Sequence, residues 1–174
     1  APLFIPYLYA LLGALAILLW PWLLVWCHDL VGRLRQLGGG GGGLLCVALL
    51  VYVVARLLAV EGPINFVEYE RVFVPGTDDL GRLGYAGWSL VARPLLAVFG
   101  GGYRLLFVTS ALFGVIAILA VTSLAMQLSG KGGVAGLAAL LLAVQPAFVR
   151  VAASASETLP SAALTIVFFD LLMR

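Results

Sequence analysis

Acidic side chains gather in one polar stretch of an otherwise apolar chain: five of the eight acidic residues lie at 61–83. Glu68 and Glu70 follow shortly after a long apolar segment ends. At a membrane surface, carboxylates can act as a general base or bind a divalent metal beside a lipid head group. A charged external loop can also serve solubility alone. The stretch is therefore predicted to be either a reactive site or a solvated loop.

A second pair of carboxylates stands near the end of the same stretch. Asp78 and Asp79 are adjacent, and they follow Gly76 and Thr77. Two neighbouring carboxylates are candidate ligands for a divalent metal ion. Thr and Asp just before an apolar run also describe a helix N-cap, which is the interpretation we favour.

Two arginines and a glutamate stand at other boundaries of the apolar segments. Arg56 lies one turn before the end of its segment, where its side chain can extend outward to the head groups. Arg150 follows a later segment, and an arginine there can bind a phosphate through two hydrogen bonds. Glu157 is a candidate at the same boundary. Ser154 and Glu157 also match a capping box, which explains both residues without a ligand.

Other reactive side chains offer little chemistry. His28 is the only histidine, so no Ser/His/Asp set can be assembled near the acidic stretch, and no glycine-rich nucleotide motif is present. Cys27 and Cys46 lack CxxC spacing and are predicted to be packing residues instead of a zinc or redox pair. Asp170 and Arg174 are four residues apart, which predicts a local ion pair near the interface.

The elements that carry these residues must be membrane helices. The chain is 63% hydrophobic and only 10% charged, with a mean hydropathy of +1.14, whereas a soluble domain has about 25% charged residues. The net charge of +2 comes from scattered basic residues, which excludes a nucleic-acid partner. We predict an all-α, polytopic membrane helix bundle.

We predict that about five apolar segments cross the bilayer. A full crossing needs about 20 residues, and shorter segments can cross where the bilayer is locally thinned. The predicted spans are 3–26, 44–60, 105–128, 134–149 and 159–173. The segment 84–99 is interrupted by Arg93-Pro94 and is predicted to be an interfacial or re-entrant helix. The polar residues 28–36 and the six glycines 38–43 predict a flexible connection, which divides the chain into 1–43 and 44–174.

The distribution of basic residues predicts how the bundle is oriented. Short connections on the cytoplasmic side of a membrane are rich in Lys and Arg. Five spans place the acidic stretch 61–83 on the opposite side. On the cytoplasmic side they place four basic residues: Arg33, Arg35, Lys131 and Arg174. Charges inside the predicted spans are nearly absent, which argues against a transporter. The small residues at 132–139 permit close packing of helices within or between subunits.

From residue 44 onward, the order of features resembles the N-terminal part of GT-C-fold glycosyltransferases, including protein mannosyltransferase-like members. The resemblance lies in the layout of 56–71, 99–104 and 146–157, which look like a helix exit with an acidic segment, the entry to the next span and a later polar boundary. The chain differs from this family in having Glu68-Tyr-Glu70 where an Asp-Glu pair is usual, in its additional first helix, and in having about half the usual spans.

The resemblance implies a membrane enzyme that uses a polyprenyl-phosphate sugar on the non-cytoplasmic face. Glu68 or Glu70 would be the general base, while Arg56, Arg150 and Glu157 would lie near the lipid phosphate or a divalent metal, the one cofactor expected. The alternative is a non-catalytic small subunit of a membrane complex. The expected partners are membrane lipids, the polyprenyl-phosphate sugar and other membrane subunits, and the expected location is a bacterial inner membrane.

Overall fold

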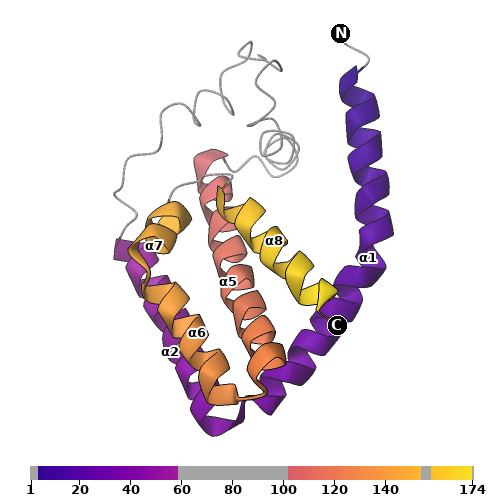
Figure 1. Cartoon of the computed structure of the whole chain (residues 1–174). Coiled ribbons are helices and arrows are strands. Elements are labelled where there is room, and N and C mark those ends of the chain that lie inside the picture. The colour runs from indigo at the N-terminus through magenta and orange to yellow at the C-terminus, as the bar shows by residue number, and fades with distance from the viewer. Residues whose placement is uncertain (1–3, 59–101, 154–157, 174) are drawn as a thin grey trace.

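A computed structural model describes residues 4–58, 102–153 and 158–173, and all regular structure in these ranges is α-helical. This confirms the prediction of an all-α bundle. Figure 1 shows α5 in the middle, with α2 and α6 side by side on one flank and α8 on the other. The helices are α1 (Phe4–Gln36), α2 (Gly38–Leu58), α5 (Gly102–Ser129), α6 (Gly132–Val144), α7 (Pro146–Ala153) and α8 (Thr158–Leu172).

Several of these helices are suited to cross a membrane. Within the described ranges, three are long and apolar enough: α1 over Ile17–Gln36, α2, and α5 over Val108–Ser129. The bent pair α6 and α7 makes a fourth if it forms one span. Helix α8 corresponds to the fifth predicted span, but its 15 residues are fewer than the roughly 20 that a perpendicular crossing needs. The acidic stretch 61–83 and the predicted interfacial helix 84–99 lie outside the described residues.

The first helix is longer than predicted. We expected the span to end at Trp26 and a flexible polar segment to follow, but α1 continues without a break to Gln36. Trp26, Leu30 and Leu37 lie at helical spacing and are buried, so one face of this segment is held against the bundle. The N-terminal half of α1 stands apart from the other helices, whereas its C-terminal half passes close to α5 and the end of α8 (Figure 1).

The run of glycines is helical, not flexible. Only Gly38, between α1 and α2, has a positive φ, of 67°, and it makes the tight turn that reverses the chain. Gly41 is buried, and a Cβ atom there would collide with the backbone of Gly132 in α6. A Cβ atom at Gly136 would lie 2.7 Å from the Gly41 carbonyl oxygen. The missing side chains therefore allow α2 and α6 to approach closely, as the small residues at 132–139 predicted.

The turn between α5 and α6 lies between the spans predicted at 105–128 and 134–149. Helix α5 ends at Ser129, and Gly130 follows with a φ of 65°. The N–H of Gly130 donates to the Met126 carbonyl oxygen at 2.9 Å, which is a common way to cap a helix end with glycine. Because Gly132 touches the start of α2, Lys131 lies at the same end of the bundle as the turn that follows Arg35.

The predicted fourth span, 134–149, is two helices instead of one. Pro146 has no N–H to donate and forces the preceding residue away from helical geometry. Gln145 accordingly has a ψ of 119°, and α7 begins at Pro146, bent by 61° from α6. Helix α7 thus turns across the end of the bundle, where it packs against α2 and α5.

Two clusters of buried side chains hold the helices together. The larger lies mainly between α2, α5, α6 and α7 and includes Tyr52, Ile118 and Ala139. The smaller joins α1, α5 and α8 and contains Trp26, Leu30, Ala120 and Val167. Helix α5 contributes to both clusters and is therefore the central element of the bundle.

Candidate functional site

The structure describes two of the residues predicted to form a site, Arg56 and Arg150. The other candidates lie outside the described residues, and their roles stay predictions: Glu68, Glu70, Asp78, Asp79 and Glu157. The two described arginines are carried by α2 and α7, which pack against each other. Both helices therefore contribute to one end of the bundle.

Arg56 is held inside the bundle. Only 5% of the residue is exposed, so the expectation that it extends outward is wrong. Its guanidinium interacts with the hydroxyl of Tyr52, one helical turn earlier in α2. Arg150, in contrast, is exposed on α7. Of these two arginines, one is thus buried and the other is open to its surroundings.

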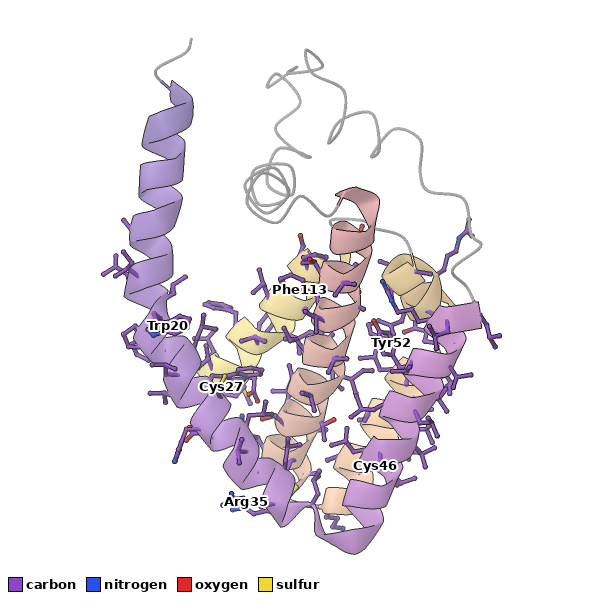
Figure 2. The ribbon with its side chains drawn as sticks, turned by 180° about the vertical axis from the view of Figure 1, so that it is seen from behind. Trp20, Cys27, Arg35, Cys46, Tyr52 and Phe113 are labelled. Atoms are coloured by element: carbon purple, nitrogen blue, oxygen red, sulfur yellow. The ribbon has the colours of Figure 1, made fainter. Side chains whose placement is uncertain are left out.

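Tyr52 organises the contacts around Arg56. Figure 2 shows it on α2, pointing toward α5, where its hydroxyl donates to the Ala111 carbonyl oxygen at 3.1 Å. Its ring lies 5.6 Å from the ring of Phe148 in α7. Gly114 makes room for it, because a Cβ atom at that position would collide with the tyrosine hydroxyl. One side chain of α2 therefore touches both α5 and α7.

The chain enters and leaves its two undescribed internal stretches at this same end. Helix α2 stops at Leu58 and α5 starts at Gly102, so the segment that contains Glu68 and Glu70 is attached here. The stretch 154–157, with Glu157, connects α7 to α8. Ser110 in α5 donates to the Ala152 carbonyl oxygen at 3.3 Å and ties α7 to the bundle. The arrangement offers positive charge beside the attachment points of the predicted carboxylates, which suits an anionic ligand.

A second polar cluster, not predicted from the sequence, surrounds Asp170 of α8. The carboxylate is fully buried. Its Oδ2 accepts a hydrogen bond from the Trp26 indole at 2.7 Å, and its two oxygens lie 3.0 and 3.2 Å from Nη1 of Arg33. Ser123 Oγ lies 3.0 Å from both oxygens, and the amide of Gln127 donates to Oδ1. We call these five residues the Asp170 cluster.

Hydrogen bonding within the cluster follows a definite direction. Nη1 of Arg33 donates to Ser123 Oγ at 2.6 Å, so the hydroxyl accepts from the arginine and has its own proton for Asp170. Gln127 also donates to the Asp170 backbone carbonyl oxygen at 3.2 Å. Asp170 has a charge partner in α1, Arg33. Arg174 lies outside the described residues, so its predicted pairing with Asp170 stays a prediction.

This arrangement stabilises a carboxylate and leaves it little capacity for chemistry. A carboxylate has about four sites that accept hydrogen bonds, and four side chains donate to Asp170. No acceptor site remains for a metal ion or a substrate proton. The described helices nevertheless carry a few charges that are buried or partly buried: Arg56 and Asp170 within the predicted spans, and Arg33, which lies outside them. Unlike an open transport site, however, the Asp170 carboxylate is fully occupied.

The spacing of the residues contained a signal for this cluster. Trp26 and Arg33 are seven residues apart, and Ser123 and Gln127 four apart, so each pair shares one helix face. An aspartate in an apolar segment requires a partner of opposite charge. The sequence alone does not select Arg33, since the polar residues around it predict a loop.

The remaining candidates form no site in the described part of the chain. Cys27 and Cys46 are free and exposed on the outside of the bundle, so the prediction that they are packing residues is wrong (Figure 2). His28 is exposed, with Nδ1 lying 3.4 Å from Asp29. Within the described ranges, no three His, Cys, Asp or Glu side chains gather as a metal site would require. In comparisons with protein-family models, curated proteins and solved structures, no match to this chain was found.

Proposed function

We propose that this chain is a GT-C-type membrane glycosyltransferase, or the N-terminal portion of one, that uses a lipid-phosphate-linked sugar on the non-cytoplasmic face. The observation that supports this most is the burial of Arg56 at the end of the bundle to which the acidic segment is attached. Burying a cation within membrane helices is costly and usually accompanies a function. A phosphate ester carried by a lipid is the anion that a membrane protein meets at this depth.

The proposed roles follow from charge and position. Arg56 and Arg150 bind the phosphate of a polyprenyl-phosphate sugar, and Glu68 or Glu70 removes the proton of the acceptor hydroxyl. Glu157 assists at the phosphate, and Asp78 and Asp79 are the proposed ligands if a divalent metal is bound. The basic turns with Arg35 and Lys131 face the cytoplasm, which fits a bacterial inner membrane.

The second candidate is a non-catalytic subunit of a membrane complex. Helix α1 favours it, because most of its described side chains between Ile17 and Val25 are exposed and make little contact with the rest of the chain. A neighbouring protein can cover such a surface, although lipid can do so equally well. Co-purification of fixed partners with the full chain, together with instability in detergent without them, would support this function.

The enzymatic proposal is tested by sugar transfer in membranes that contain the full-length protein. Polyprenyl-phosphate mannose and glucose serve as donors, and Glu68→Gln, Glu70→Gln and the double variant are compared with the parent. Loss of a general base is expected to slow transfer by about 10² to 10⁴ fold. Unchanged transfer in all three variants would refute the assignment of the base.

The phosphate role has a matched control. Arg150 and Arg35 are both exposed arginines. Arg150 is on α7 and Arg35 in the last turn of α1, and these two segments lie at opposite ends of the bundle (Figure 1). Arg150→Gln is expected to raise the KM for the donor about tenfold, because a hydrogen bond to a charged group is lost, and Arg35→Gln should leave it unchanged. Equal effects of the two substitutions would argue that only general surface charge matters.

A further inference from the structure

Helix α1 is attached to the bundle over a short distance. Its buried residues Trp26 and Leu30 join the small cluster with Ala120 and Val167, and Leu34 packs against it, while the helix stands apart over its N-terminal half (Figure 1). Lipid chains are as apolar as leucine, so apolar contact alone gives two membrane helices little reason to associate. The polar contacts made by α1 must therefore contribute strongly to its position.

Those polar contacts converge on a residue that needs them. Asp170 belongs to α8, which has only 15 residues, and its carboxylate is completely shielded. An ionised aspartate without a compensating charge is unfavourable inside a membrane bundle. The compensating charge is that of Arg33, which is 137 positions away in the sequence. One ion pair thus joins helices from opposite ends of the described chain.

We propose that the charge of Arg33 keeps α8 seated against α1, so that α8 leaves this position when the charge is removed. Trp26 and Arg33 supply the donors from α1, whereas Ser123 and Gln127 supply those from α5. This inference stands independently of the proposed enzymatic activity, because it concerns only how the helices associate.

Arg33 and Asp170 differ in how each side chain can respond when the other charge is removed. Arg33 is 17% exposed and lies in the last turn of α1, so its long side chain can turn toward the membrane boundary. Asp170 is fully buried on a short side chain and has no such route. Removing Arg33 must therefore be more damaging than neutralising Asp170. Neutralising Asp170 as well should repair much of the damage caused by losing Arg33.

Cross-linking in native membranes tests this order of effects. The full chain is made free of native thiols by Cys27→Ser and Cys46→Ser, both at exposed positions. Leu30→Cys and Val167→Cys then place thiols in the buried cluster shared by α1, α5 and α8. A protease site is also inserted at 76–83. After cleavage at this site, the two halves of the chain stay together in SDS only if a short bis-thiol reagent has joined the two cysteines.

Three variants are compared in this background: Arg33→Met, Asp170→Asn and the double substitution. Because neighbouring charges are coupled by about 0.5–3 kcal/mol, we expect Arg33→Met to reduce cross-linking about fivefold. Asp170→Asn should reduce it less than about twofold, and the double variant should match Asp170→Asn. Equal losses in the two single variants, with an additive loss in the double variant, would overturn the proposal.

A second thiol pair separates this effect from general unfolding. Leu45→Cys and Ala139→Cys lie in the larger core cluster, on α2 and α6. Their cross-linking is expected to be the same in all three variants, since the Asp170 cluster does not include these helices. If Arg33→Met reduced this cross-link as much as the first, the whole bundle would be unfolding and the specific role of the ion pair would be refuted.

Discussion

The contact between α2 and α6 makes a quantitative prediction for Gly136→Ala. An added Cβ atom would lie 2.7 Å from both the Gly41 carbonyl oxygen and the Leu44 Cβ atom, whereas ordinary contact begins at 3.4 Å. The two helices must therefore separate by about 0.7 Å, and such overpacking typically costs about 1–3 kcal/mol. Alanine also favours a helix over glycine by about 1 kcal/mol, which offsets part of this loss.

Gly133→Ala is the matched control for this substitution. Gly133 is on the same helix, three residues earlier, but it is exposed and nothing lies within 4 Å of its Cβ position. The Gly133→Ala variant therefore gains the higher helix propensity of alanine without a collision. The two variants should differ by about 2 kcal/mol in the free energy of unfolding, with Gly136→Ala the less stable.

Unfolding in mixed micelles measures this difference. Both variants are titrated with SDS in dodecyl maltoside while helix content is followed by circular dichroism. Gly136→Ala should unfold at a clearly lower SDS fraction than Gly133→Ala. If Gly136→Ala unfolded at the same fraction or a higher one, the close approach of α2 and α6 would not limit the side chain at this position, and the reasoning would fail.

Two further predictions use the same titration. Tyr52→Phe removes the hydroxyl that donates to a carbonyl of α5 and is expected to lower stability by about 1 kcal/mol; an unchanged midpoint would mean that this hydrogen bond contributes nothing. Gly38→Ala should destabilise by about 1–2 kcal/mol, because Gly38 has a φ of 67° but an open Cβ position. Gly39→Ala, which is helical and equally open, should be neutral or stabilising, and equal behaviour of these two glycine variants would contradict the left-handed turn.

Much of the fold could be predicted because its causes are local. The apolar segments and the glycine-rich turn at 129–133 depend on composition and on backbone preferences that neighbouring residues determine. The break at Pro146 also has a local cause, and the proline indicates it directly. The hydrophobicity of 134–149 predicts one span, whereas the proline within it predicts the break.

Other features could not be predicted because they depend on tertiary contacts. The glycines at 38–43 disfavour a helix by their intrinsic propensity, yet the approach of Gly41 to α6 gives that helix a partner. Residues 28–36 look like a polar loop until Leu30 and Arg33 are placed against α5 and α8. The choice of Arg33 as the partner of Asp170 requires knowledge of which helices are neighbours. The site is predicted least well, since most of its candidate residues lie outside the described ranges.

The bend at Pro146 also affects the lipids around the protein. With α6 along the membrane normal, its 13 residues rise by about 20 Å, and the 8 residues of α7, turned by 61°, add only about 6 Å. Their combined height of about 26 Å is less than the hydrocarbon thickness of about 30 Å. A bilayer adapts to such hydrophobic mismatch by thinning next to the shorter element. The head groups beside α7 are thereby drawn inward, toward the exposed side chain of Arg150.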